Sequence, residues 1–202
     1  MQIIYLHGFR SSPLSKKGQE LYQYCANHDH IHVHLPDLNQ PPEVVLKYVS
    51  NLIESLPLDQ VVLVGSSLGG FYATYFVAKY DCPAVLINPA MQPWQLFQEL
   101  FGIEQIPLKV TESWTLDHDQ LQQLQSIADT KPEQADKILV LLQQDDEVLD
   151  YRQAQRYYSA LHPSALILTD VGGNHAMDDF EEKLPLVLEF LSAALQKGNQ
   201  TK

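Results

Sequence analysis

The sequence predicts an α/β protein with a mostly parallel sheet of about six strands and helices on both faces. Short apolar runs recur along the chain, and longer segments with helical spacing separate them. Several of these runs are apolar at every position, which is typical of strands that are covered on both faces. Strands that alternate with helices form parallel sheets through right-handed crossovers. These two observations predict the fold class.

The candidate strands and helices alternate from the N-terminus onward. The strands are "IIYL" (3–6), "IHVHL" (31–35), "VVLVG" (61–65), "AVLI" (84–87), "ILVLL" (138–142) and "ALILT" (165–169). The candidate helices lie near residues 16–27, 42–55, 69–80, 150–161 and 183–196. Every strand except the fourth is therefore followed by one of these helices.

Residues 91–135, after the fourth strand, carry no strand signal and contain two further segments with helical spacing. "PWQLFQELFG" places Trp94, Phe97 and Phe101 on one helical face, and "DHDQLQQLQSIAD" carries a second apolar face. A helical insertion between two core strands is the usual form of a lid. We expect residues 1–202 to form a single domain with a helical lid at about 91–135, lined by the three aromatic side chains.

The composition argues against several classes of function. The 202 residues carry a net charge of −12, whereas nucleic acids and anionic lipids are bound by Lys and Arg. The two cysteines are too few for a disulfide framework. No apolar run approaches the roughly 20 residues of a membrane span, and a strand begins at Ile3, which leaves no room for a signal peptide. We expect a cytoplasmic protein that binds neither nucleic acid nor membranes.

The turn after the third strand carries the strongest motif. Gly65-Ser66-Ser67-Leu68-Gly69 matches G-x-S-x-G between a strand and a helix, the pattern of a nucleophile elbow in α/β-hydrolases. Only Ser67 occupies the central position. Small neighbours let the strand and the helix approach closely, so that the strained turn projects the serine hydroxyl from the sheet. The alternative is a glycine-rich turn that binds phosphate, but no phosphate-loop or dinucleotide motif is present.

The partners of such a serine should follow it in the order acid, then histidine. His175, in "DVGGNHAMDDF", is the one histidine that follows the last candidate strand, and it is the candidate general base. The acid should follow "ILVLLQQ", where the chain reads Asp145-Asp146-Glu147. The spacing leaves both Asp145 and Asp146 open. The acid would orient the imidazole and stabilise the imidazolium.

An acyl-transfer site also needs donors for the developing oxyanion. One donor should be the backbone N–H of Leu68, directly after the serine. The other should be the N–H of Phe9, in the loop "YLHGFRSSP" that follows the first strand. His7 in this loop is expected to be a structural hydrogen-bonding residue and not a base.

Six segments together resemble the YqiA-like esterases, small cytoplasmic serine hydrolases with the α/β-hydrolase fold. They are "YLHGFRSSPLSKK", "LPDL", "VGSSLGGFYAT", "NPAMQPWQLF", "LLQQDDEVLDYRQA" and "GGNHAMDDFE". The resemblance implies carboxylic-ester hydrolysis, with acyl-CoA thioester hydrolysis as a related possibility, and no metal or organic cofactor. By position it implies that Ser67 is the nucleophile, His175 the base and Asp146 the acid. The chain departs from the family in having Asp145 where members tend to have glycine.

Two other features have alternative interpretations. "HDHIHVH" places His32 and His34 on one face of a strand, which suits a metal site, but no Cys or carboxylate cluster joins them and solvated imidazoles are favoured. Arg10, Lys16 and Lys17 follow the presumed oxyanion loop and could bind an anionic leaving group such as CoA, although ordinary surface charge at a helix start is favoured.

The predicted function is therefore that of a serine esterase, which cleaves esters of small to medium acyl groups through an acyl-enzyme on Ser67. An acyl-CoA thioesterase with the same three residues is the alternative. The rival from another class is a non-catalytic hydrolase-fold protein that binds a ligand, and the presence of all three residues argues against it. The expected partner is a small-molecule ester, and the sequence does not indicate an oligomeric state.

Overall fold

A computed structural model describes residues 1–200 of the chain, and its core is a parallel sheet of six strands in the order β2-β1-β3-β4-β7-β8. The strands are β1 (Gln2–Leu6), β2 (His32–His34), β3 (Val61–Ser66), β4 (Ala84–Ile87), β7 (Ile138–Gln143) and β8 (Leu166–Asp170). Each predicted strand is present within two residues of its expected ends, so the predicted fold class is confirmed.

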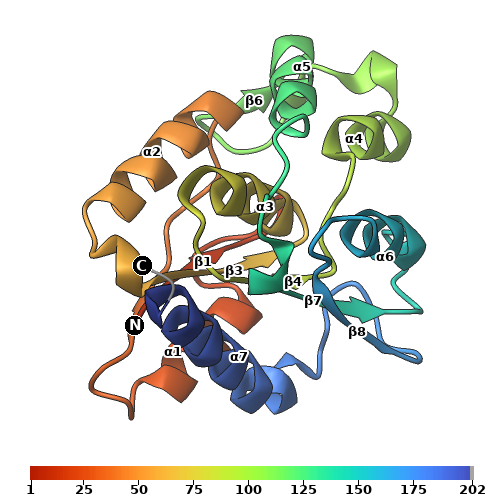
Figure 1. Ribbon diagram of the computed structural model, residues 1–202. Helices are drawn as coiled ribbons and strands as arrows, with labels where there is room; N and C mark the ends of the chain where they lie inside the picture. Colours follow the sequence, from red (N-terminus) through yellow and green to blue (C-terminus); the bar gives the residue numbers. More distant parts are fainter. Residues whose placement is uncertain (201–202) are drawn as a thin grey trace.

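Five helices cover the two faces of the sheet. They are α1 (Lys16–Cys25), α2 (Pro42–Glu54), α3 (Leu68–Tyr80), α6 (Tyr151–Ser159) and α7 (Phe180–Gln200). Figure 1 shows α2, α3 and α6 on one face and α1 and α7 on the other. Short 3₁₀ helices precede two of the strands: η1 (Leu58–Gln60) lies before β3 and η3 (Ala135–Lys137) before β7.

The two faces of the sheet form two separate apolar cores. Along β1, Ile4 and Leu6 pack under α2 and α3, whereas Ile3 and Tyr5 pack under α1 and α7. Successive side chains of a strand point to opposite faces, so a strand that is covered twice must be apolar at every position. This explains the uninterrupted apolar runs of the sequence.

Residues 91–135 lie between β4 and β7 as an insertion above the sheet (Figure 1). The insertion contains the two expected helices, α4 (Pro93–Phe101) and α5 (His118–Ile127), and a 3₁₀ turn, η2 (Ile103–Gln105). It also contains an antiparallel pair of two-residue strands, β5 (Leu108–Lys109) and β6 (Thr115–Leu116), which the sequence did not predict. Two residues are too few to show the alternation that identifies a strand.

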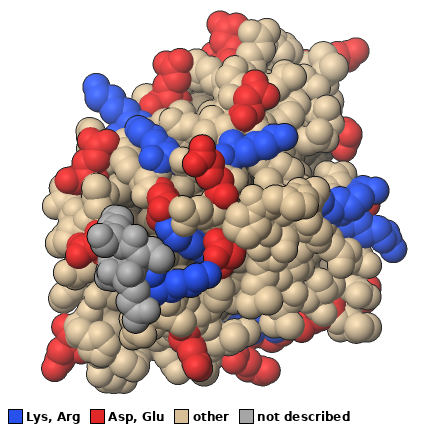
Figure 2. Space-filling model, viewed as in Figure 1, with Lys and Arg blue, Asp and Glu red and all other residues tan. Residues whose placement is uncertain are grey.

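The charged side chains of the surface and the hydropathy of the helices can both be compared with what the sequence predicts. On the face drawn in Figure 2, Lys and Arg side chains stand among Asp and Glu side chains and form no continuous basic patch. In the described part of the chain, no helix combines the length and the hydropathy that a membrane span requires.

The start of α3 packs directly on the backbone of β1 and β3, and this contact positions the turn between β3 and α3. A Cβ atom on Gly69 would collide with the carbonyl oxygen of Leu6, and one on Gly65 would collide with the backbone of Gly69. Both obstacles are main-chain atoms, which cannot rotate away as a side chain can. The glycines are therefore required for the close approach of the helix to the sheet.

We expect Gly69→Ala to lower the free energy of unfolding by about 1–3 kcal/mol, because the added methyl overpacks the contact with Leu6. Alanine would otherwise favour the helix by about 1 kcal/mol, so a net loss identifies the contact. Urea unfolding measures the change. The matched control is Gly198→Ala in α7, where an added Cβ meets no atom within 4 Å and no loss of stability is expected. Equal stability of the two variants would contradict the role of the contact.

Candidate active site

The backbone of Ser67 is strained and held in place. Its dihedral angles are φ 54° and ψ −118°, a conformation that a residue with a side chain rarely adopts. The Ser67 N–H donates to the carbonyl of Ile87 at 3.0 Å, and the Ser67 carbonyl accepts from Gly70 at 2.9 Å and from Ala90 at 3.1 Å. Contacts with the end of β4 and the start of α3 thus stabilise the turn that presents the hydroxyl.

The structure brings Ser67, His175 and Asp146 into one hydrogen-bonded chain. His175 Nε2 lies 3.0 Å from Ser67 Oγ, and His175 Nδ1 lies 2.8 Å from Asp146 Oδ2. A carboxylate only accepts, so the imidazole proton belongs on Nδ1, and Nε2 is left to accept from the serine hydroxyl. The acceptor nitrogen of His175 thus faces the Ser67 hydroxyl.

The acidic loop after β7 distinguishes the two aspartates that spacing left open. Asp146, and not Asp145, bonds to His175, and its side chain is only 2% exposed. Its other oxygen, Oδ1, accepts the N–H groups of Val148 and Leu149, both at 2.8 Å. These bonds lock the carboxylate in place, whereas Asp145 is exposed to solvent.

The two expected oxyanion donors belong to segments that adjoin Ser67. A Cβ on Gly8 would contact the Ser67 side chain, so the loop after β1 runs beside the serine. Within residues 1–200, the N–H groups of Phe9 and Leu68 have no hydrogen-bond acceptor. Leu68 is also the first residue of α3, where backbone N–H groups are free and the helix dipole is positive.

His7 is a buried structural residue, as expected. Its Nε2 accepts the N–H of Leu38 at 2.9 Å, which leaves Nδ1 to donate to the carbonyl of Gly8 at 2.8 Å. Burial lowers the pKa of His7 and outweighs the Gly8 carbonyl and the Asp37 carboxylate, 3.5 Å away, both of which raise it. A neutral imidazole therefore connects the loop after β1 to the segment after β2.

Arg10, Lys16 and Lys17, the three candidates for binding a CoA group, form hydrogen bonds with groups of the protein. Lys17 Nζ donates to the carbonyl of Ala176, directly after His175, and burial lowers the pKa of this lysine. Lys16 Nζ bonds the backbone and the carboxylate of Asp178. Arg10 donates to the carbonyl of Lys109 in the insertion at 3.2 Å. The two lysines thus attach α1 to the histidine loop.

Two buried amides at the site were missed by the sequence reasoning. Asn88 follows β4 and Gln143 ends β7, and each is 2% exposed. Both side chains bond to the loop that carries His175. The available signal was a polar residue directly after an apolar strand, at the carboxyl ends of the strands, where ligand sites of parallel sheets usually form. That signal is weak because most such residues cap or solvate a loop.

A cavity of about 500 Å³ lies between α3, α6 and the insertion. Ala90 and Phe71 form part of its wall, and the N–H groups of both donate to the Ser67 carbonyl, but neither Ser67 nor His175 lines it. Trp94 lines the cavity as part of α4. The other two aromatics expected to line the lid pack on Phe9 instead, with ring centroids 4.3 Å (Phe97) and 6.0 Å (Phe101) away.

The histidine-rich segment shows no converging ligand set. His34 Nε2 lies 2.8 Å from the Gln2 amide oxygen, and the rings of His28 and His30 contact each other edge to face. Among residues 1–200, no three His, Cys, Asp or Glu side chains are grouped as a metal site requires.

Known proteins support the family assignment. A model described as "Uncharacterised protein family (UPF0227)" matches residues 2–192. The chain belongs to this family. UPF0227 protein YcfP of Salmonella arizonae is 25% identical over 190 residues, which cover 93% of this chain and 97% of YcfP. The resemblance to YqiA-like proteins, which belong with YcfP in this family, is therefore confirmed.

Solved structures with low sequence identity share the architecture of this UPF0227 chain. Est1E from Butyrivibrio proteoclasticus, of which one structure has ferulic acid bound, matches 96% of this chain and 88% of its own with a TM-score of 0.72 at 18% identity. Mouse alpha/beta hydrolase domain-containing protein 10 matches 97% of this chain and 90% of its own with a TM-score of 0.67 at 14% identity. Similarity at this identity shows the fold, which is the α/β-hydrolase fold.

The buried neutral state of His7 predicts a pH dependence of stability. Because its pKa is lowered in the folded chain, the unfolded chain binds the proton first as the pH falls below about 6.5. The contribution of neutral His7 to the free energy of unfolding is fully present above that pH. Below it, this contribution falls by up to about 1.4 kcal/mol per pH unit, until the pKa of His7 in the folded chain is reached.

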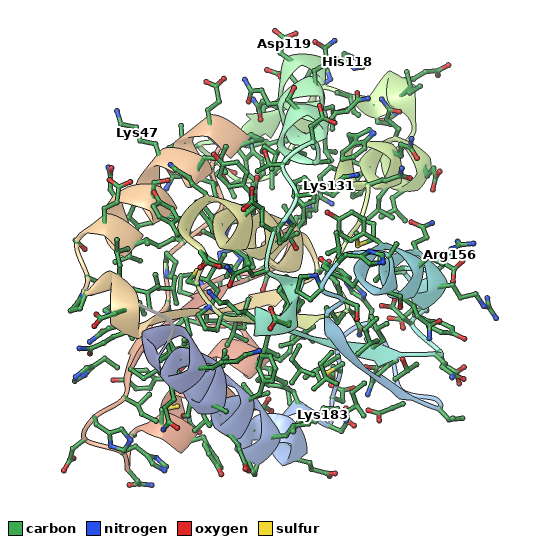
Figure 3. The ribbon with its side chains drawn as sticks, in the orientation of Figure 1. Lys47, His118, Asp119, Lys131, Arg156 and Lys183 are labelled. Atoms are coloured by element: carbon green, nitrogen blue, oxygen red, sulfur yellow. The ribbon has the colours of Figure 1, made fainter. Side chains whose placement is uncertain are left out.

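His7→Gln retains an acceptor for Leu38 but does not titrate, so it should make the loss of stability between pH 7 and pH 5 less steep. Urea unfolding at several pH values measures the slope. His118→Gln, at an exposed position of α5 (Figure 3), is the matched control and should keep the slope of the unmodified protein. Identical slopes for all three proteins would contradict the assignment to His7.

Proposed function

We propose that this protein is a serine hydrolase that cleaves carboxylic esters of small to medium acyl groups. The observation that carries the proposal is the hydrogen-bonded chain from Ser67 through His175 to Asp146, with distances of 3.0 and 2.8 Å. A binding protein would have no need of a strained serine, an oriented histidine and a locked carboxylate at one point.

The proposed reaction forms and then breaks an ester on the protein. Ser67 Oγ attacks the acyl carbon while its proton moves to His175 Nε2, and the negative charge develops on the carbonyl oxygen. The N–H groups of Phe9 and Leu68 would stabilise that oxygen, each being worth about 10²–10³ in rate. The imidazolium then gives its proton to the departing alkoxide, which leaves as an alcohol.

Water completes the cycle by the same route in reverse. His175 Nε2 removes a proton from a water molecule, whose oxygen attacks the acyl carbon of the acyl-enzyme. The second tetrahedral intermediate collapses, Ser67 Oγ takes back its proton from the imidazolium, and the carboxylic acid leaves. Throughout, Asp146 would orient the ring and stabilise its positive charge without becoming protonated.

The fold neighbours are compatible with this reaction. Est1E has been seen with ferulic acid bound, and a carboxylic acid is the type of product that ester hydrolysis releases. We further propose that residues 91–135 act as a lid of a single hydrolase domain, and that the cavity of about 500 Å³, whose wall includes Phe71 and Ala90, accepts part of the substrate.

The nucleophile is tested with a serine-reactive fluorophosphonate probe. The intact protein should be labelled and Ser67→Ala should not, because only a serine activated by a neighbouring base reacts readily. Asp146→Asn should lower kcat by about 10⁴-fold, since the amide no longer holds the imidazole in the required tautomer. Asp145→Asn is the matched control and should retain activity. Equal labelling of Ser67→Ala and the intact protein would refute the proposed nucleophile.

The substrate is tested with acyl esters and acyl-CoA thioesters of graded chain length. We expect esters to be cleaved with the higher kcat/KM, because Lys16 and Lys17 already bond the histidine loop. A preference for the CoA thioesters would replace the esterase assignment by thioesterase activity on the same three residues.

Trp94→Ala should change the chain-length profile by several-fold per methylene, because each buried methylene contributes about 0.8 kcal/mol and Trp94 lines the cavity. Leu100→Ala is the control, since Leu100 is on the same helix but is 54% exposed. The profile is measured as kcat/KM against acyl length. If the two variants give the same profile as the intact protein, the cavity does not accept the acyl group.

A further inference from the structure

The loop that carries His175 must reach across two strand ends. It follows β8 at the edge of the sheet, whereas Ser67 follows β3, and β4 and β7 lie between them. Neighbouring strands are 4.7–4.9 Å apart, so the loop spans about 14 Å. Residues 171–179 contain no helix or strand that could make this reach rigid. The position of the imidazole therefore depends on what lies under the loop.

Asn88, at the end of β4, lies under the loop and binds it twice. Its Nδ2 donates to the carbonyls of Asn174 at 3.2 Å and His175 at 3.3 Å, and its Oδ1 accepts the N–H of Gln143 at 3.0 Å. Two partners can only accept and one can only donate, so the orientation of this amide is unambiguous. Both amide protons are used on the histidine loop.

Gln143, at the end of β7, binds the same loop at two other points. Its Oε1 accepts the N–H of Asn174 at 2.7 Å, and its Nε2 donates to Asp179 Oδ1 at 2.7 Å. Asp179 in turn pairs with Lys183 at 2.9 Å, near the start of α7 (Figure 3). Gly173, with φ 82°, lies so close to the Gln143 side chain that a Cβ there would collide with it.

We propose that Asn88 and Gln143 are positioning residues that set the distance of His175 Nε2 from Ser67 Oγ. The inference rests on the proposed hydrolase function, but the two amides would act on the loop and not on the substrate. Each amide comes from the end of one of the two strands that the loop crosses. Both are buried and uncharged, so they fix the loop without adding a charge that competes with Asp146 for the imidazolium.

The test uses two variants that remove the bonds but keep the volume. Asn88→Asp keeps the acceptor for Gln143 and tolerates the local φ of 40°, but an ionised aspartate has no protons for the carbonyls of Asn174 and His175. Gln143→Met keeps the length of the side chain and removes its hydrogen bonds to the loop. In each variant kcat should fall by about 10- to 100-fold with KM changed less than about twofold, because a misplaced base slows the chemical step.

A second readout does not depend on activity. The proton shared by His175 Nδ1 and Asp146 should give a far-downfield resonance in the NMR spectrum of the resting protein. In Asn88→Asp and Gln143→Met we expect this resonance to be lost or broadened. The controls are Asn51→Asp on the exposed surface of α2 and Gln144→Met at the exposed position beside Gln143, which should keep both the resonance and kcat.

The outcomes separate this inference from the proposed function. If the variants fold and keep the resonance and a kcat within about twofold of the intact protein, Asn88 and Gln143 do not position His175. If the intact protein shows the resonance but neither reacts with a fluorophosphonate nor cleaves esters, the proposed function fails, and the NMR comparison still decides whether the amides hold the loop. Should Asn88→Asp not fold, Gln143→Met carries the same test.

Discussion

The strained backbone of Ser67 is the constraint on which the rest of the site depends. A φ of 54° would relax if β3 and α3 could separate. They cannot, because Gly69 lies against the Leu6 carbonyl, and because Ile87 at the end of β4 and Ala90 in the following loop bond the N–H and the carbonyl of Ser67. The tight contact makes the hydroxyl project from the sheet. It also places the unbonded N–H of Leu68, the first residue of α3, directly after the serine.

The strand order decides what can meet that hydroxyl. In a parallel sheet, the loops that follow the strands all lie at the carboxyl ends of the strands, and their polar groups can meet there. The loop after β1 lies next to Ser67, because β1 and β3 are neighbours. Asp146 comes from β7, two strands away, and His175 comes from β8, three strands away. The loop that carries His175 therefore spans the longest distance. It is held by hydrogen bonds from the lysines of α1 and from the buried amides of Asn88 and Gln143.

The insertion is connected to the same loop that supplies the Phe9 N–H. Phe97 of α4 and Trp114 beside β6 pack against the Phe9 ring, and Arg10 bonds a carbonyl of β5 and lies over the Phe101 ring. The insertion thus packs on the residue that carries one candidate oxyanion donor, although it contributes no residue to the Ser67, His175 and Asp146 chain.

Local sequence patterns were enough to predict the six strands, the flanking helices, the elbow around Ser67 and the place of His175 after the last strand. These features follow from local periodicity and turn chemistry, which depend only on residues that are close in sequence. Spacing left Asp145 and Asp146 open, and the family resemblance pointed to Asp146; the folded chain shows that Asp146 is the one in contact with the histidine. The contacts of Asn88, Gln143 and Lys17 were visible only in the folded chain. Those choices depend on strand order and on which of several similar side chains is buried, because residues distant in sequence meet only in the folded chain.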